Sequence, residues 1–254
     1  MTDLLPPING PKLSPFYKEI RENNIEFKEY LGPDTTRWDS KRKPQSRVFR
    51  VLIDGDQYCL KVFGFIHPDK LRHSTPNGDD LLAGDLLRYQ LHPFYAECRA
   101  LGLLKEKNKN GELAVRCHGY ASIPLAVEQQ IRKQFGLDDW NRKPEDEGQP
   151  LWAIVKNYIC SDSVCGGEEL SVMRTKLQQL NDIGIYHMDI KEDNYRGGQL
   201  FDFSAAITRP NVWLRPTFRS WKLINEDLSY DLVAFDKMAD DIKGKRIENQ
   251  EIEE

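Results

Sequence analysis

The sequence predicts an α+β protein with two lobes, a small antiparallel sheet followed by a shortened set of helices. Two apolar runs, residues 48–53 and 58–63, flank Asp54-Gly55, which is a strong signal for a β-hairpin. Residues 168–183 repeat leucine and methionine at helical spacing, which predicts an amphipathic helix. Beyond that helix, residues 184–208 carry most of the side chains suited to chemistry.

The composition is that of a globular domain in water. Hydrophobic residues make up 39% of the 254-residue chain and charged residues 30%. The formal net charge of -4 gives no reason to expect nucleic acid to bind through bulk charge, although a local basic patch would suffice. No apolar run approaches the ~20 residues that span a bilayer, and no secretory signal is visible, so we expect no membrane contact. Five cysteines without paired CxxC spacing predict reduced thiols in the cytoplasm or the nucleus.

The N-terminal third begins with segments that show little of the hydrophobic periodicity of helices or strands. Residues 1–16 are rich in proline and glycine and predict an extended arm on the domain surface. Residues 25–31 alternate in polarity, as a strand does. The polar segment 32–46 contains the basic run 41–43 and one glycine, Gly32. It is a loop over a ligand, a phosphate site built from Arg and Lys side chains, or a solvated hairpin.

The remaining elements complete a division of the chain into four parts. Strands are expected at residues 112–120 and 152–159, a helical piece with a polar loop at 125–149, and one or two helices at 224–242. The expected parts are an N-terminal arm at 1–24, a sheet lobe with insertions at 25–160, a shortened helical lobe at 161–242, and a frayed acidic tail at 243–254.

A lysine stands in an unusually apolar strand. Lys61 lies within YCLKVFGF, where burial is costly unless the ammonium group is paired. The alternative is that Lys61 faces solvent on an edge strand. If it is buried, Glu97, near the start of the predicted helix in HPFYAECRALGLLKE, is the candidate partner.

The stretch GIYHMDIKEDNYRGGQLFDFSAAIT places acidic and amide side chains on two loops joined by a tight Gly197-Gly198 turn. Asp189, Lys191 and Asn194 belong to the first loop, and Asp202 belongs to the second. Carboxylate and amide oxygens that lie close together suit Mg²⁺, which prefers oxygen ligands. Because Asp, Asn and Gly are also ordinary turn residues, the alternative is a polar turn without chemistry.

The pattern His-x-Asp-x-Lys-x-x-Asn, followed by Asp-Phe, resembles the catalytic and metal loops of the protein-kinase-like superfamily. Over most of residues 10–208 the chain is similar to a family of fungal kinase-like domains often labelled as a kinetochore complex subunit. The pieces that carry the resemblance are GPKLSPF, LKVFGF, HPFYAECRALGLL, ELAVRCHGY, AIVKNYI and LNDIGIYHMDIKEDNYRGGQLFDFSAAIT. The resemblance implies a two-lobed protein-kinase-like fold.

The same resemblance implies roles for eight residues and a need for Mg²⁺ and ATP. Lys61 would hold nucleotide phosphates, with Glu97 as its partner. Asp189 would be the catalytic base, and Lys191 would neutralise charge on the transferred group. Asn194 and Asp202 would hold the metal ion. Backbone groups of the segment 156–159, which includes Lys156 and Tyr158, would meet the adenine ring.

Departures from the kinase pattern leave three functions open. The glycine-rich phosphate loop is missing, Met188 and Ser204 replace an arginine and a glycine, and too few residues follow Ser204 for a peptide-binding subdomain. The first function is a Mg²⁺- and ATP-dependent phosphotransferase-like enzyme that acts on a small molecule. The second is an arginine-containing cyclodipeptide synthase of fungal secondary metabolism, which uses aminoacyl-tRNA. The third is a non-catalytic pseudokinase module of a protein complex.

The second function assigns different tasks to the same residues. Asp189 or Glu97 would bind the guanidinium group of arginine or shuttle a proton. Residues 41–47, either the run Lys41 to Lys43 or Arg47, would contact tRNA phosphates. Both enzyme functions need the same acidic pocket, so the sequence does not separate them.

Overall fold

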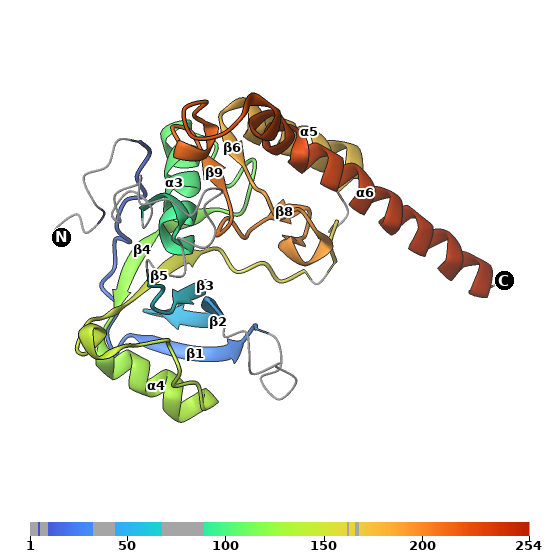
Figure 1. Ribbon diagram of the computed structural model, residues 1–254. Coiled ribbons are helices and arrows are strands. Elements are labelled where there is room, and N and C mark those ends of the chain that lie inside the picture. The colour runs from blue at the N-terminus through green and yellow to red at the C-terminus, as the bar shows by residue number, and fades with distance from the viewer. Residues whose placement is uncertain are drawn as a thin grey trace.

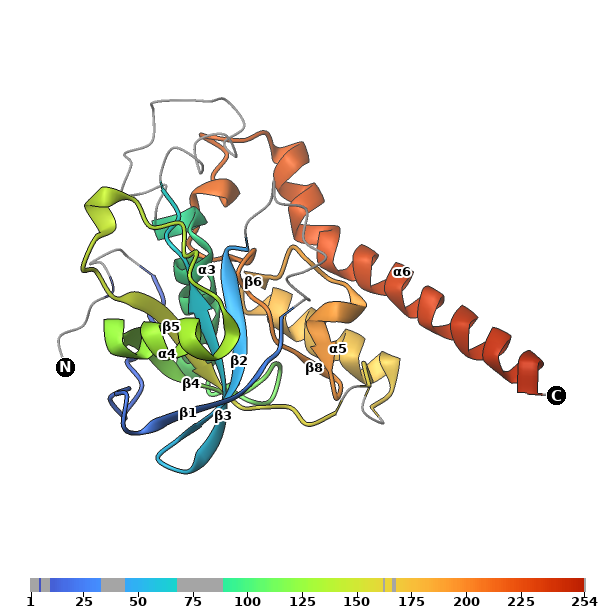
Figure 2. The same cartoon turned by 90° about the horizontal axis from the view of Figure 1, so that it is seen from below.

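A computed structural model describes the chain at residue 5 and over residues 10–32, 44–67, 89–161, 163–165 and 168–253. It shows an α+β fold with a five-stranded antiparallel sheet in the order β1-β2-β3-β5-β4 and a helical region on one side of it (Figure 1). This confirms the predicted fold class. Seen from below, the sheet and the helical region remain side by side (Figure 2).

The sheet forms from the predicted strands and hairpin. Its strands are β1 (Ile25–Tyr30), β2 (Ser46–Ile53), β3 (Asp56–Phe63), β4 (Cys117–Ile123) and β5 (Leu151–Lys156). Asp54 and Gly55 join β2 to β3, and both have positive φ angles, 50° and 84°. Two successive positive φ angles are those of the tight turn that matches strand twist, which explains why Asp-Gly predicted this hairpin correctly.

The two faces of the sheet contact different partners. One face buries Phe49, Val51 and Leu60 beneath helix α4 (Leu125–Phe135). The other face packs on helix α3 (Pro93–Glu106), whose side chains share a core with the helical region. Because side chains alternate along a strand, the odd-numbered residues of β3, including Lys61, point toward α3.

The helical region is built from two long helices and short strands that carry the polar loops. The helices are α5 (Leu170–Asp182) and α6 (Trp221–Glu253), and α5 covers the predicted helix at 168–183. Two short sheets pair β6 (Ile185–Tyr186) with β9 (Ile207–Thr208) and β7 (Tyr195–Arg196) with β8 (Gln199–Leu200). The 3₁₀ helices are η2 (Pro144–Asp146), η3 (Glu192–Asn194) and η4 (Val212–Leu214).

Three expectations from the sequence are wrong. The arm is extended but not superficial, because Leu13 and Phe16 are buried in the two cores. Regular strand structure does not begin at residue 112, since β4 starts only at Cys117. The acidic tail is not frayed: α6 continues as one helix to Glu253 and extends beyond the rest of the protein in both views (Figures 1 and 2).

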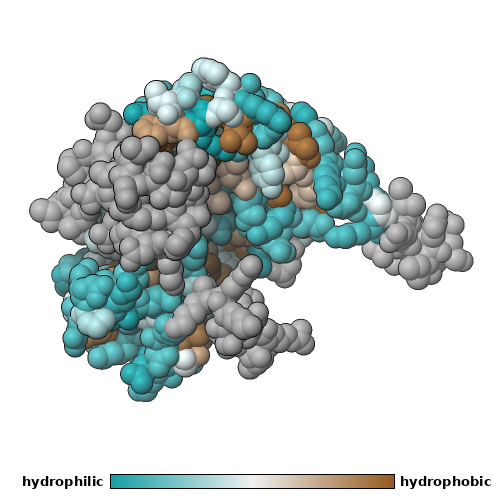
Figure 3. Space-filling view, in the orientation of Figure 1, coloured by the Kyte–Doolittle hydropathy of each residue, from teal (hydrophilic) through white to brown (hydrophobic). Residues whose placement is uncertain are grey.

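One face of the surface shows where hydrophilic and hydrophobic residues lie. The face seen in Figure 3 is mainly hydrophilic, with hydrophobic residues scattered over the region of α5 and α6. The large apolar side chains of α5 and α6 that are exposed include Val172, Trp221, Leu223, Tyr230 and Val233. Within the described ranges, no helix combines the length and the apolar character needed to cross a membrane.

The contact between α3 and the N-terminal segment gives a test of this packing. A Cβ atom at Gly102 would lie 2.5 Å from the backbone carbon of Lys12. We expect Gly102→Ala to lower the free energy of unfolding by about 1–3 kcal/mol through overpacking, although alanine favours helix. Gly244, in α6, has nothing within 4 Å of such a Cβ, so Gly244→Ala should be neutral or stabilising. Urea unfolding of both variants measures the two changes in the free energy of unfolding. Equal changes would contradict the close packing of α3 on the N-terminal segment.

Candidate functional site

Four of the predicted site residues, Lys61, Lys156, Tyr158 and Asp202, line one pocket between the sheet and the loops of the helical region. The other four, Glu97, Asp189, Lys191 and Asn194, do not line it. The pocket has a volume of about 160 Å³. Its apolar walls are formed by Leu31, Val48, Cys59, Val115, Ile159 and Phe201. Its polar lining is formed by Lys61, Lys156, Asn157, Tyr158, Asp193, Arg196 and Asp202. Apolar walls with a few convergent polar groups are typical of sites for small ligands.

Lys61 is buried and binds two carboxylates. Its Nζ atom lies 2.7 Å from Oε2 of Glu97 and 2.7 Å from Oδ1 of Asp202. The Lys61 side chain is 2% exposed and that of Glu97 is 0% exposed, so both ionised groups are removed from water. The expected ion pair of Lys61 with Glu97 is therefore present, and the alternative of a solvent-facing lysine is wrong.

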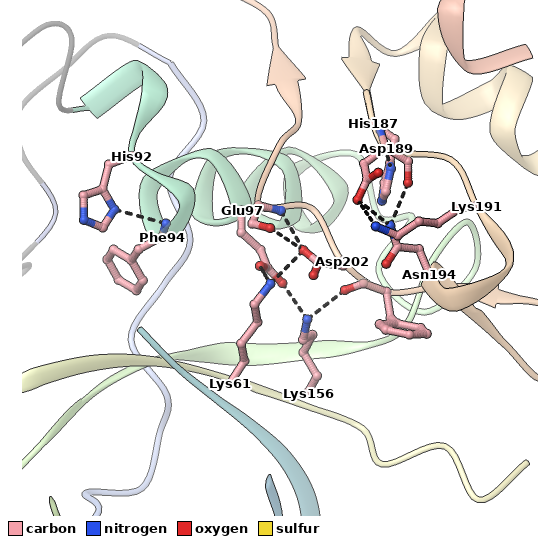
Figure 4. Close-up of polar contacts among 12 residues, drawn as sticks. Lys61, His92, Phe94, Glu97, Lys156, His187, Asp189, Lys191, Asn194 and Asp202 are labelled. Carbon is pink, nitrogen blue, oxygen red and sulfur yellow. Dashed lines mark hydrogen bonds and ion pairs between the residues drawn. The ribbon is translucent and has the colours of Figure 1, made fainter. Parts of the chain in front are cut away.

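A second lysine binds the same glutamate. Nζ of Lys156 lies 2.5 Å from Oε1 of Glu97 and donates a hydrogen bond to the carbonyl oxygen of Phe201 at 2.8 Å. We expected backbone groups at Lys156 to meet a ligand, and no pattern in the sequence predicted this role for its side chain. Figure 4 shows Lys61, Lys156, Glu97 and Asp202 pointing toward one another.

The strand register explains why the two lysines meet. β3 and β5 are antiparallel, with Lys61 opposite Ile154 and Cys59 opposite Lys156. Residues at positions i and j+2 of such a pair are diagonal neighbours on one face of the sheet. Lys61 and Lys156 therefore project from the same face toward α3, where the carboxylate of Glu97 binds both ammonium groups.

The charges hold one another in the ionised state. Burial by itself would lower the pKa of Lys61, but attraction by Glu97 and Asp202 outweighs burial and raises it above its usual value. Burial would likewise raise the pKa of Asp202, but Lys61 and Lys156 hold it well below its usual range. Ser204 adds hydrogen bonds from its backbone N–H and its hydroxyl group to Oδ1 of Asp202.

A second polar cluster lies on the loop that carries Asp189 (Figure 4). Nζ of Lys191 lies 2.8 Å from Oδ2 of Asp189, and this contact raises the pKa of Lys191. Asn194, in η3, donates from Nδ2 to the backbone oxygen of Asp189 at 2.7 Å and to its Oδ2 at 3.0 Å. The Asp189 side chain is 45% exposed, so a ligand can reach it.

A buried aspartate that the sequence analysis did not identify positions this loop. Asp231 of α6 is 0% exposed and accepts hydrogen bonds from the backbone N–H groups of His187 and Met188, at 2.6 and 2.8 Å. Met188 has a φ of 65°, which is strained for a residue with a long side chain. The sequence did contain a signal: Asp231 interrupts the apolar stripe of Ile224, Leu228, Phe235, Met238 and Ile242.

The structure corrects two assignments made for an aminoacyl-tRNA-dependent enzyme. Arg47 is buried, and its guanidinium carbon lies 4.4 Å from the ring centroid of Trp140, so it does not offer its charge to tRNA phosphates. Both carboxylate oxygens of Glu97 are bound by lysines, so Glu97 is not free to bind an arginine ligand. Residues 41–43 of the expected basic patch lie outside the described part of the chain.

Other pocket residues were only partly foreseen. Tyr158 and Ile159 line the pocket as expected for the segment 156–159, and Arg50 lies over the Tyr158 ring at 5.5 Å. Asp193 and Arg196 also line the pocket, although the sequence analysis assigned no role to either. The catalytic, cofactor-binding and metal-binding roles of all these residues stay predictions.

Removing the shared carboxylate tests the buried network. Glu97→Gln leaves two buried ammonium groups without their common counter-charge, and we expect the free energy of unfolding to fall by about 3–5 kcal/mol. The control is Glu112→Gln, which removes an exposed partner of Lys109 and should cost at most about 1 kcal/mol. Chemical denaturation of both variants measures these values. A loss of less than about 1 kcal/mol for Glu97→Gln would contradict the network.

His187 should make stability depend on pH. Burial lowers its pKa below the usual value, although Asp231 and other carboxylates oppose this. An unfolded histidine takes up a proton near pH 6.5 and the buried one does not, so stability falls as the pH drops below about 6.5. We expect His187→Gln to remove up to about 1.4 kcal/mol per pH unit of that fall, measured by urea unfolding at pH 5.5 and 7.5. An unchanged pH dependence would rule out this role.

Comparison with known proteins identifies one family. The profile of the family described as kinetochore Sim4 complex subunit FTA2 matches residues 2–207 of this chain. None of the curated proteins matches it significantly. The matched range includes the sheet, α3, α5 and both polar clusters, and it ends before α6. The chain belongs to the kinetochore Sim4 complex subunit FTA2 family.

Proposed function

We propose that this chain is a kinase-like enzyme that binds a Mg²⁺–nucleotide, ATP in the simplest case, and acts on a small molecule as a phosphotransferase. The observation that carries the proposal is the position of Lys61, whose ammonium group lies 2.7 Å from both Glu97 and Asp202 at the floor of the pocket. A lysine shared by a helix glutamate and a loop aspartate is the arrangement that protein-kinase-like sites use for phosphate and metal.

Carboxylate and amide oxygens of the two loops are the kind of ligand that a hard divalent cation binds. Lys61 and Ser204 occupy Oδ1 of Asp202, which leaves Oδ2 available, and the side chain is 32% exposed. The amide nitrogen of Asn194 is turned toward Asp189, so its amide oxygen points away from that carboxylate. Asp202 and Asn194 would hold Mg²⁺ through these oxygens, and the ion would offset phosphate charge when bound.

The charge of the pocket gives a reason to expect a cation. Lys61, Lys156 and Arg196 are balanced by Glu97, Asp193 and Asp202, so the groups in and behind the pocket sum to zero. A nucleoside triphosphate carries several negative charges. We therefore expect it to bind with the metal ion rather than alone.

Asp189 and Lys191 would act on the second substrate. The Asp189 carboxylate is half exposed and is held by Asn194, so it is placed to accept a proton from a nucleophilic hydroxyl group. Lys191, at 2.8 Å, would offset charge that develops on the transferred group. Only 18 residues separate Asp202 from the start of α6, which leaves little chain for a peptide-docking segment. We therefore propose a small-molecule acceptor.

Thermal unfolding tests the proposal. With Mg²⁺ and ATP together at about 100 times the Kd, we expect the melting temperature to rise by about 5–10 °C, and neither component alone should do this. Asp202→Asn should abolish the shift. Glu192→Gln is the control, because Glu192 pairs with Lys245 and does not line the pocket. No shift of the wild-type protein with any nucleotide and Mg²⁺ would refute the proposal.

A second candidate is a non-catalytic subunit of a multiprotein complex, because the description of the matching family names a complex subunit. This candidate has protein partners and a nuclear location, as the family description suggests, and uses the pocket for binding or for stability only. This candidate would be favoured if partners co-purify in stoichiometric amounts and Asp189→Asn does not change their amount. Loss of function with that variant, while partners are still bound, favours the enzyme.

The aminoacyl-tRNA-dependent alternative now depends on Asp189. Its half-exposed carboxylate is available to the guanidinium group of an arginine ligand, whereas both oxygens of Glu97 are bound by lysines. Expression in bacteria and mass spectrometry for an arginine-containing cyclic dipeptide separates this enzyme from a phosphotransferase. Soluble protein without such a product would exclude it.

A further inference from the structure

We propose that Lys156 makes the floor of the pocket an oxyanion-binding site, in which it and Lys61 together hold a phosphate or carboxylate group of the ligand. The inference rests on the proposed function in placing the ligand in this pocket. It adds a recognition residue, Lys156, and a ligand position between two ammonium groups.

Charge is the first argument. Lys61 and Glu97 alone would form a neutral pair with little attraction for an anion. Lys156 binds the other oxygen of Glu97, so the three groups on β3, β5 and α3 carry a net charge of +1. Asp202, which also binds Lys61, brings the sum of the four groups to zero until a cation binds its other oxygen, so the anion is expected to bind together with the metal ion.

The count of hydrogen-bond donors is the second argument. An ammonium group has three N–H donors. Lys61 uses one on Glu97 and one on Asp202, and Lys156 uses one on Glu97 and one on the Phe201 carbonyl. Both lysines line the pocket, so the third donor of each is left for a ligand.

Burial makes these donors effective. Lys61 is 2% exposed and Lys156 is 3% exposed, so water competes poorly for them. Charge-assisted hydrogen bonds are stronger than neutral ones, and a low local dielectric strengthens them further. Because one carboxylate holds both ammonium groups, a single group with two or three oxygens can bridge them (Figure 4).

Isothermal titration of wild type and Lys156→Met tests the site, with Mg²⁺ present throughout. The probes are pyrophosphate, malonate, ATP and the uncharged adenosine. We expect Lys156→Met to weaken binding of pyrophosphate or malonate, and of ATP, at least about tenfold, because a hydrogen bond to a charged group is lost. Adenosine affinity should change less than twofold. Lys105→Met is the control, since Lys105 also holds a backbone carbonyl, that of His118, away from the pocket.

Each outcome bears on the inference. Anion affinity within twofold of wild type in Lys156→Met overturns it, as does a wild type that binds none of the anions. Pyrophosphate or malonate binding that depends on Lys156, without any ATP binding, upholds it and refutes the nucleotide function. Preference for pyrophosphate or malonate identifies the oxyanion as phosphate or carboxylate. If Lys156→Met does not fold, Lys156→Gln keeps a donor for Glu97 without the charge and must give the same loss.

Discussion

The fold depends on one carboxylate with two ammonium partners. Glu97 belongs to α3, and its oxygens bind lysines from β3 and β5, so the helix cannot separate from the sheet without leaving two buried charges unpaired. Lys156 also binds the carbonyl of Phe201, and Lys61 also binds Asp202. The sheet, the helix and the loop after β8 are therefore held in register by four charged side chains.

The second polar cluster is supported from the opposite side. Asp231 of α6 accepts two backbone N–H groups at His187 and Met188, and Asn181 of α5 donates to the same carboxylate at 2.9 Å. His187 in turn packs against Phe203 with ring centroids 5.0 Å apart. The strained backbone of Met188 is thus held by Asp231 of α6, which is itself bound by Asn181 of α5. These hydrogen bonds position Asp189 relative to the loop that carries Asp202.

How much the sequence could predict depends on whether a feature arises from neighbouring residues or from residues far apart in the chain. The hairpin at Asp54-Gly55, helix α3 and the Lys61–Glu97 pair were predictable, because turn chemistry, periodicity and the cost of burying a lysine are local or pairwise. Lys156 was missed as a side-chain participant, because its role depends on the register of β3 against β5. The burial of Phe16 and of Arg47 likewise depends on neighbours distant in sequence, namely Tyr58 and Trp140.

Stability alone does not explain the charged floor of the pocket. Burying Lys61, Lys156 and Glu97 costs desolvation energy that ion pairing often only balances, and apolar side chains of similar volume would fill the space at least as well. The neighbouring sheet positions show this, since Ile154 and Phe63 pack against α3 without any charge. Ionised groups whose pKa values are shifted, and which converge on a pocket, are typical of functional sites. The demands of the core therefore do not account for these charges, whereas the binding of a charged ligand, as proposed above, would.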